Sequence, residues 1–128
     1  STVTLVSSQR SSVMSNLRNM ANAVKACFEL AGAEVIQNDG YPAWKMNADS
    51  ELQRIAIQEY KKLFGHDPKV LGIHAGLECG LFSEKYPGID MISFGPTLRF
   101  VHTPDERLLI PTVQMVWDHM LAILREID

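Results

Sequence analysis

Hydrophobic residues recur at two different spacings along this chain, and the alternation of the two spacings predicts its elements. Short apolar runs typical of β-strands occupy residues 3–6, 33–37, 69–73 and 90–94. Apolar residues three or four positions apart, as on one face of a helix, occupy residues 17–31, 52–63 and 113–127, and a shorter helix is expected at 77–85. Because strands and helices alternate, the pattern predicts an α/β fold with helices packed against a sheet.

Residues with strong preferences for helix ends mark the first two long helices. Ser11 and Ser12 offer an N-cap to the first helix, and Gly32 ends it. Ser50 caps the second helix, and Gly65 ends it. The first helix is expected to bury one apolar stripe, made of Leu17, Met20, Ala21, Val24, Phe28 and Ala31. The last helix is expected to bury Val113, Val116, Trp117, Met120, Leu121, Leu124 and Ile127.

An aperiodic stretch at residues 41–47 separates two parts of the chain. Residues 1–37 predict a strand, a helix and a strand, whereas residues 47–128 alternate helix and strand. We interpret the stretch as a connector in which Tyr41 and Trp44 are packing residues. The second part is expected to contain a mostly parallel sheet.

Composition and charge exclude several classes of function. The chain has 128 residues, 46% of them hydrophobic, and a formal net charge of −3, which is typical of one ordinary globular domain and not of a disordered chain. Its 12 Lys and Arg residues are scattered along the chain, so a nucleic-acid partner is not expected. No apolar run approaches the roughly 18 residues of a membrane span, so we expect no membrane partner.

The cysteines and the N-terminal stretch favour a cytoplasmic protein. Cys27 and Cys79 do not form a disulfide framework, and Cys27 is expected to be a buried thiol on the apolar side of its helix. The N-terminal stretch lacks the basic region and the long apolar segment of a signal peptide. The chain starts with Ser1 and not with Met, which indicates processing or excision from a longer sequence.

Polar residues in two loops after predicted strands are candidates for chemistry. His102 lies in a polar loop at residues 99–105, where its imidazole can bind Zn²⁺ or can be an ordinary surface histidine. His74, Gly76 and Glu78 follow another strand, at the sheet edge where ligands bind in open α/β folds. Glu78 near a helix start can equally serve as a partner of the helix dipole.

Arg10 follows the first predicted strand, and its guanidinium group can hold a carboxylate through two hydrogen bonds or can be solvated.

No complete set of catalytic residues accompanies these candidates. The sequence has no Gly-x-Ser-x-Gly elbow, no His-Glu-x-x-His motif and no Gly-rich phosphate loop. His102 and Glu78 are too few for a metal enzyme, which needs three or more ligands. We therefore name no catalytic residue in this chain.

Four segments carry a resemblance to a known family. They are Arg10-Ser11-Ser12, Gly40-Tyr41-Pro42-Ala43-Trp44-Lys45, residues 72–82 (GIHAGLECGLF) and residues 90–107 (DMISFGPTLRFVHTPDER). In this order they resemble the bacterial aminoacyl-histidine dipeptidases of the M20 metallopeptidases, also called Xaa-His dipeptidases, peptidase D or cytosol non-specific dipeptidases. The resemblance covers essentially all 128 residues in register.

The resemblance implies a specific domain organisation. Enzymes of this family have an α/β catalytic domain that holds two metal ions, usually zinc, and an inserted ferredoxin-like lid domain that often carries the dimer contact. On that pattern residues 1–40 are the second half of the lid, and residues 41–128 are the C-terminal part of the zinc-peptidase catalytic domain. A cytoplasmic homodimer formed through the lid is the implied assembly.

The resemblance also implies roles for single residues. His102, in the segment His-Thr-Pro-Asp-Glu, matches the last metal ligand of the family. Arg10 matches a lid arginine that grips the terminal carboxylate of the substrate, and His74, Gly76 and Glu78 match the loop that lines the substrate pocket. The metal would be zinc, with cobalt or manganese as alternatives.

Two departures from the family pattern qualify this reading. The family commonly has small residues before the metal-binding His, as in Arg-Gly-Ala-His, where this chain has Arg99-Phe100-Val101-His102. The motifs that hold the family's other ligands and its general base are absent from this chain. The implied function is hydrolysis of Xaa-His and related dipeptides by metal-activated water, the chain being a C-terminal fragment that is inactive alone. A degenerate, free-standing binding or dimerisation module is the alternative, and a complete small α/β domain with structural motifs is the third interpretation.

Overall fold

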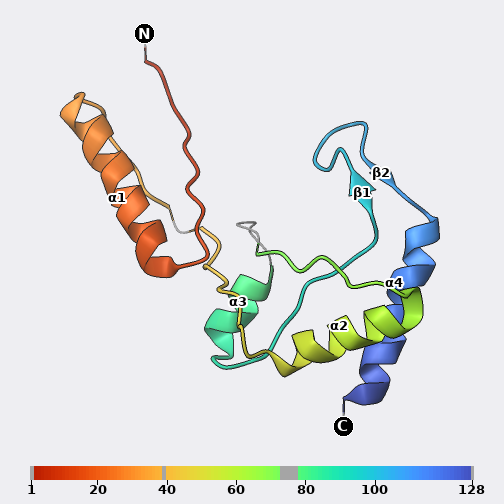
Figure 1. The fold of residues 1–128 in the computed structure, drawn as a ribbon. Coiled ribbons are helices and arrows are strands. Elements are labelled where there is room, and N and C mark those ends of the chain that lie inside the picture. Colours follow the sequence, from red (N-terminus) through yellow and green to blue (C-terminus); the bar gives the residue numbers. More distant parts are fainter. Residues whose placement is uncertain (1, 39, 73–77, 128) are drawn as a thin grey trace. The chain divides into compact units, whose positions relative to one another are not determined.

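Four helices and one pair of short strands make up the regular structure of the computed structural model, which describes residues 2–38, 40–72 and 78–127. The helices are α1 (Met14–Leu30), α2 (Glu51–Phe64), α3 (Glu78–Lys85) and α4 (Pro111–Glu126), and the strands are β1 (Leu98–Arg99) and β2 (Arg107–Leu108) (Figure 1). All four helices lie where the hydrophobic pattern predicts helices. None of those described is long and apolar enough to cross a membrane.

The chain divides into two compact units. Unit 1 contains residues 1–46 and 71–89, and unit 2 contains residues 47–70 and 90–128. Unit 1 therefore holds α1 and α3, and unit 2 holds α2, α4 and the strand pair. The assignment of residues 1–40 to a lid and of residues 41–128 to a catalytic domain stays a prediction.

The four predicted strands are not formed. As far as the structure describes them, residues 3–6, 33–37, 69–73 and 90–94 have no strand hydrogen bonding, and residue 73 lies outside the described residues. The one sheet in the described part of the chain is antiparallel, with Leu98 opposite Leu108 in β1 and β2. A strand requires hydrogen bonds to a neighbouring strand, and these apolar runs meet no such neighbour among the described residues. The hydrophobic pattern therefore located the apolar segments but not their pairing.

The predicted N-cap of α1 is wrong, and its predicted glycine C-terminus is confirmed. Val13 is the N-cap residue, and its side chain makes no capping bond; the hydroxyl of Ser11 accepts a hydrogen bond from the Val13 N–H at 3.2 Å instead. The helix thus begins later than the serine pair predicts. At the other end Gly32 has a φ of +83°, and the N–H of Ala33 donates to the carbonyl of Phe28 at 3.0 Å. This is the left-handed glycine ending that the sequence predicts.

The exposed and half-buried residues of α1 follow the predicted stripe only in part. Leu17, Ala21, Val24 and Phe28 are half-buried, whereas Met20 and Ala31 are exposed. Cys27 is also exposed, so the prediction of a buried thiol is wrong. Successive helical residues are rotated by about 100° around the axis, which turns Cys27 away from the half-buried side on which Phe28 lies.

Both predicted ends of α2 are confirmed. The hydroxyl of Ser50 accepts a hydrogen bond from the N–H of Gln53 at 2.9 Å, which satisfies one of the free N–H groups of the first turn. At the C-terminus Gly65 has a φ of +75°, and its N–H donates to the carbonyl of Lys61 at 2.9 Å. Glycine adopts this left-handed conformation without the steric cost of a Cβ atom.

Unit 2 is held together by a contact between α2 and α4. Ala56 of α2 and Ile123 of α4 are the buried apolar residues of the described chain. His119 of α4 is also buried, and its Nε2 lies 2.8 Å from the carbonyl oxygen of Ala56. The rings of Tyr60 and Phe94 lie 5.3 and 5.1 Å from the His119 ring, between centroids. The sequence assigns no role to His119, which is a core histidine.

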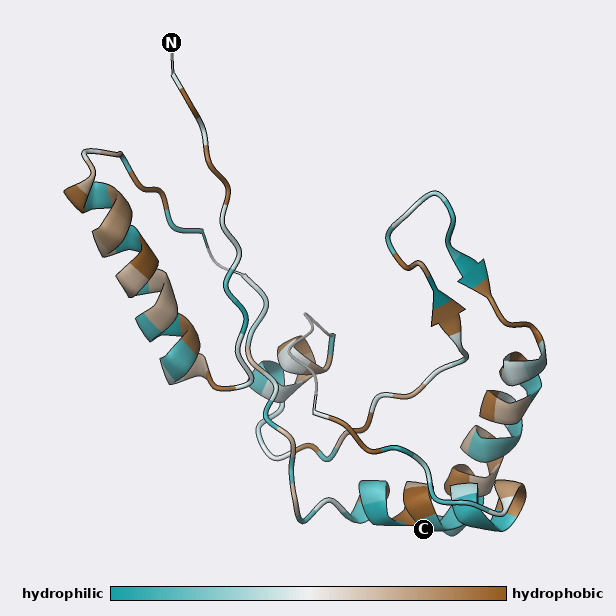
Figure 2. Cartoon of the chain, turned by 45° about the horizontal axis from the view of Figure 1, so that its top comes forward, coloured by the Kyte–Doolittle hydropathy of each residue, from teal (hydrophilic) through white to brown (hydrophobic). Residues whose placement is uncertain are grey.

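The predicted apolar face of α4 is only partly buried. Val116, Met120 and Leu121 are half-buried, but Trp117 and Leu124 are exposed by 53% and 57%. The helix carries apolar residues on more than one side, and the side that faces α2 is the one centred on His119. Figure 2 shows further apolar stretches in the N-terminal segment and at the approach to α4.

A carboxylate fixes the segment after α3 to the start of α2 within unit 2. Oδ2 of Asp90 accepts hydrogen bonds from the hydroxyl of Ser50 and from the N–H of Leu52, both at 2.9 Å. The N–H of Leu52, and to a lesser degree the Ser50 hydroxyl, hold the pKa of Asp90 below its ordinary value of 3.8 although burial acts in the opposite direction. A carboxylate at a helix N-terminus is also stabilised by the helix dipole.

Candidate functional site

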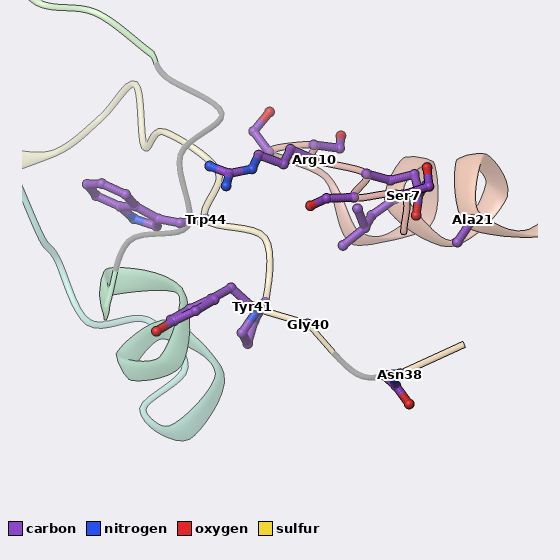
Figure 3. Close-up of a pocket in the computed structure, with 13 residues that line it drawn as sticks. Ser7, Arg10, Ala21, Asn38, Gly40, Tyr41 and Trp44 are labelled. Atoms are coloured by element: carbon purple, nitrogen blue, oxygen red, sulfur yellow. The ribbon is translucent and has the colours of Figure 1, made fainter. Parts of the chain in front are cut away.

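A pocket of about 290 Å³ opens in unit 1 beside the first turns of α1 (Figure 3). Residues 7–12 line one side of it, and Leu17 and Ala21 of α1 contribute apolar surface. The remaining lining residues are Asn38, Gly40, Tyr41, Pro42 and Trp44. The pocket therefore brings together two of the four segments that carry the family resemblance, which lie about 30 residues apart in the sequence.

Arg10 supplies the charge of this pocket. It is the one charged residue among the described residues that line it, and its side chain is exposed to solvent. It forms no ion pair with any carboxylate in the described part of the chain. Figure 3 shows its guanidinium group turned to the side of the pocket on which Trp44 lies. A guanidinium in this setting can bind a carboxylate through two parallel N–H···O bonds.

The segment that carries Tyr41 and Trp44 is fixed from two sides. The N–H of Ala43 lies 3.1 Å from Sδ of Met14 in the first turn of α1. On the other side, Pro42 lies against Gly80 of α3 so closely that a Cβ atom added to Gly80 would be 3.2 Å from the Pro42 carbonyl carbon and closer still to its oxygen. Glycine at position 80 is thus required for this approach, because any other residue would place a Cβ atom against the Pro42 backbone.

Of the other predicted substrate-binding residues, Glu78, His74 and Gly76, the structure describes only Glu78, which is not brought to the pocket of Arg10. Glu78 is exposed in the first turn of α3 and is not among the described residues that line the pocket. Its position suits a favourable interaction with the helix dipole, which is the structural role that the sequence leaves open. His74 and Gly76 lie outside the described residues. Their proposed roles, like that of Glu78, stay predictions.

His102 lies at the end of a β-hairpin in unit 2. The sequence predicts a polar loop at residues 99–105, and in the structure the pairing of β1 with β2 closes this loop into a hairpin. His102 is exposed, and its N–H donates to Oε2 of Glu106 at 2.9 Å. The hydroxyl of Thr103 donates to the carbonyl of Phe100 at 2.7 Å. Thr103 and Glu106 of the His-Thr-Pro-Asp-Glu segment thus hold the backbone at Phe100 and at His102.

The backbone at this hairpin is strained. Phe100 and His102 have φ angles of +56° and +66°, and among the described residues they are the non-glycine residues with positive φ. The left-handed region costs an ordinary residue about 1–2 kcal/mol relative to a right-handed conformation. Strain of this kind persists where the surrounding structure enforces it, and it concentrates at functional sites. The observation singles out the same histidine as the sequence resemblance does.

The described residues do not by themselves form a metal site. They contain no group of three or more His, Cys, Asp or Glu side chains near enough to hold one ion. The exposed imidazole of His102 is chemically suited to act as one zinc ligand, but a zinc site requires three or four. Because the donor set is incomplete, no metal-dependent step follows from the described residues of this chain alone.

Two aromatic residues line the pocket although the sequence does not select them as binding residues. Tyr41 and Trp44 are interpreted above as packing residues, but both line the pocket that contains Arg10. Asn38 and the polar residues 7–9 also line it, although no pattern in the sequence selects them. The signal that could have found Trp44 is the resemblance itself, because it covers the Tyr41–Trp44 segment together with Arg10.

Comparisons with known proteins agree on one class of enzyme. The chain is 41% identical over 99 residues to the cytosol non-specific dipeptidase of Escherichia coli (strain K12), a match that covers 77% of this chain and 20% of that protein. It is 47% identical to the aminoacylhistidine dipeptidase of Vibrio alginolyticus, whose crystal structure matches with a TM-score of 0.74 over 92% of this chain and 24% of the other. No family model matches the chain.

These matches confirm the α/β fold class, since the described part of the chain superposes on part of a dipeptidase of that class. The chain spans about a quarter or less of the length of these relatives. Both relatives carry names that the sequence resemblance had already pointed to. Over this segment, the chain is confirmed as a relative of the aminoacylhistidine and cytosol non-specific dipeptidases.

Proposed function

We propose that this chain is part of a metal-dependent dipeptidase of the M20 type that hydrolyses dipeptides of the Xaa-His class. The observation that carries the proposal is the 47% identity to an aminoacylhistidine dipeptidase over 92% of the chain. The pocket around Arg10 supports it, since a free carboxylate is the group that distinguishes a dipeptide from an internal segment of a polypeptide. The name of the Escherichia coli relative also agrees with the cytoplasmic location expected from the sequence.

In this proposal the residues of the chain bind and orient the substrate. Arg10 holds the terminal carboxylate of the dipeptide and thereby sets the distance from the carboxylate to the scissile bond. Productive orientation of this kind can contribute much of a rate enhancement, because reacting groups are brought together in advance. Glu78, His74 and Gly76 are proposed to complete the surface around the substrate.

His102 is proposed to be one ligand of a two-ion site, with zinc as the expected metal and cobalt or manganese as alternatives. The bound metal would activate water and polarise the peptide carbonyl. The remaining ligands and the general base have to be supplied from outside these 128 residues. We therefore propose that the chain alone is inactive, and that in the whole enzyme residues 1–40 belong to a lid that forms the homodimer.

The proposal is tested by assaying the purified 128-residue chain, and a longer polypeptide that contains it, against Xaa-His dipeptides with added zinc or cobalt. We expect turnover by the longer polypeptide alone. In that polypeptide His102→Ala should reduce both the metal content and the rate, whereas His66→Ala, at an exposed histidine of unit 2, should change neither. Full metal occupancy in His102→Ala would remove His102 from the site, and rapid turnover by the chain alone would refute its proposed inactivity.

A further inference from the structure

The wall of the pocket opposite to its polar residues is aromatic. Trp44 and Tyr41 line the same space as Arg10, and Figure 3 shows the Arg10 guanidinium turned to the side where the indole ring of Trp44 lies. We propose that Trp44 is a specificity-determining residue, which stacks on the side chain of the C-terminal residue of a dipeptide while Arg10 binds the carboxylate of that residue. This inference rests on the proposed function and adds to it the group that selects the side chain.

The size of the pocket fits one amino-acid residue. Its volume of about 290 Å³ is just below the roughly 300–1,000 Å³ typical of small-molecule sites. A carboxylate and a side chain that leave the same Cα atom must both be accommodated close together in a space of this size. Arg10 and Trp44 therefore meet two neighbouring parts of one ligand residue and not two distant parts of a longer peptide.

Trp44 is better placed for this role than Tyr41. Trp44 is half-buried, whereas Tyr41 is 54% exposed. The backbone next to Trp44 is fixed by the contact of Ala43 with Met14 and by the close approach of Pro42 to Gly80. An indole carried on a backbone that is fixed before the ligand arrives loses less conformational entropy on binding than one carried on a mobile segment.

The charge of the pocket determines which side chains of the bound C-terminal residue it favours. Since Arg10 is the one charged group among the described lining residues, a basic side chain would be repelled, and an acidic one would compete with the carboxylate for the same guanidinium. A planar, uncharged ring is compatible with both neighbours, because it can stack on the indole in an offset or edge-to-face arrangement. The imidazole of histidine meets this requirement, and the methyl group of alanine leaves the indole uncovered.

The test measures ligand binding by Trp44 fluorescence and by NMR. The chain has two tryptophans, so Trp117→Phe leaves Trp44 as the reporter. Trp117 is an exposed residue of α4 in unit 2 and is not among the described residues that line the pocket. The probes are N-acetylhistidine, N-acetylalanine and N-acetylhistidinamide, which carry both groups, the carboxylate alone and the imidazole alone. We expect N-acetylhistidine to bind about two- to tenfold more tightly than N-acetylalanine.

Substitutions then assign the difference to one side chain. In Trp44→Leu, measured by NMR, the preference for histidine should disappear while N-acetylalanine binds as before; Trp117→Leu is the matched control and should retain the preference. In Arg10→Gln both acetylated amino acids should bind more weakly, and N-acetylhistidinamide should be unaffected. Equal affinity of the native chain for the two acids, a preference that survives Trp44→Leu, or no binding of either acid would overturn the inference.

These outcomes are separable from the proposed function. The probes resemble a product of dipeptide hydrolysis, so their binding requires neither a metal ion nor turnover. Selective binding combined with the absence of dipeptidase activity in every longer polypeptide would refute the enzyme and retain the pocket. Dipeptidase activity combined with unselective binding would refute the role of Trp44 alone.

Discussion

The carboxylate of Asp90 and the hydroxyl of Ser50 are joined by a hydrogen bond of 2.9 Å, although they lie 40 residues apart in the sequence. The same hydroxyl accepts the N–H of Gln53 and so caps α2. One serine therefore serves the start of a helix and the attachment of a distant segment. Ser50 is itself buried, which keeps water from competing for these bonds.

The Asp90 carboxylate should make the stability of unit 2 depend on pH. Because the N–H of Leu52 and the Ser50 hydroxyl hold its pKa below the ordinary value of 3.8, the charged form is more stable in the folded chain than in the unfolded chain. The resulting stabilisation is fully present above the ordinary pKa and is lost as the pH falls through the lowered folded pKa. Asp90→Asn should reduce the free energy of unfolding by about 1 kcal/mol at neutral pH.

Urea denaturation at a series of pH values measures this effect. The difference between the native chain and Asp90→Asn should shrink as the pH is lowered below 3.8. Asp105→Asn, at an exposed position in the hairpin loop, is the control and should show no such difference at any pH. If the difference in the free energy of unfolding between the native chain and Asp90→Asn stays constant down to strongly acidic pH, the charge of Asp90 does not stabilise the fold.

Helix ends could be predicted from the sequence because their causes are local. Ser50, Gly65 and Gly32 act on backbone groups within a few residues of themselves, and all three behave as predicted. The bond from Ser50 to Asp90 could not be predicted, since no sequence spacing indicates a partner 40 residues away. For the same reason the prediction of strands from the apolar runs is wrong for the described residues, because a strand depends on a distant partner that the local pattern does not specify.

A methyl group at position 80 should be destabilising although it lies in a helix. Alanine is ordinarily favoured over glycine in a helix interior by about 1 kcal/mol. Here the added Cβ atom would overlap the carbonyl of Pro42, which belongs to the backbone and cannot rotate away. We expect Gly80→Ala to lower the free energy of unfolding by about 1–3 kcal/mol, as other overpacked sites do.

Thermal denaturation compares this variant with Gly72→Ala, where no atom of the described residues, apart from the chain neighbours of Gly72, lies within 4 Å of the added methyl group. The control should be neutral or slightly stabilising, because alanine reduces the freedom of the unfolded chain. Gly80→Ala should also change the fluorescence of Trp44 in the Trp117→Phe background, since Pro42 and Trp44 belong to the same short segment. A Gly80→Ala chain at least as stable as the parent would show that Pro42 and Gly80 do not pack as described.

Replacement of Phe100, the strained residue two positions before His102, by glycine should stabilise the hairpin. Phe100 has a φ of +56°, a conformation that glycine adopts without penalty. The family that this chain resembles commonly has a small residue, glycine, at this position. Phe100→Gly should therefore stabilise the hairpin by up to about 1 kcal/mol, while Val101→Gly should destabilise it by about 0.5–1 kcal/mol, the usual cost of introducing glycine.

Hydrogen exchange of the His102 amide reports the local opening of this hairpin, because that N–H is bonded to Glu106 in the closed form. Exchange should become slower in Phe100→Gly and faster in Val101→Gly. Both side chains are exposed, by 60% and 46%, so the comparison isolates the backbone effect from burial. Faster exchange in Phe100→Gly would indicate that the phenyl ring contributes more than the strain costs.

Single residues of the candidate site could be predicted from the sequence, but which residues lie together in one pocket could not. The sequence predicts Arg10 as a candidate because a guanidinium group can bind a carboxylate, and Arg10 lines a pocket in the structure. Trp44 was interpreted as a packing residue, since nothing in the spacing shows that the connector folds back beside residues 7–12. The strain at His102 is likewise invisible in the sequence, because it arises from the closure of the hairpin around Phe100 and Glu106.

Removal of the His119 ring should cost more than removal of its hydrogen bond alone. Since the carbonyl of Ala56 can only accept, Nε2 of His119 carries the proton in this contact. His119→Phe keeps a ring against Tyr60 and should lose about 0.5–1.5 kcal/mol, the net value of one hydrogen bond. His119→Ala also leaves a cavity between α2 and α4 and should lose about 2 kcal/mol or more. His66→Ala, at an exposed histidine, should stay within about 0.5 kcal/mol of the parent in urea denaturation. Equal losses for His119→Phe and His119→Ala would mean that the ring contributes nothing to the packing of unit 2.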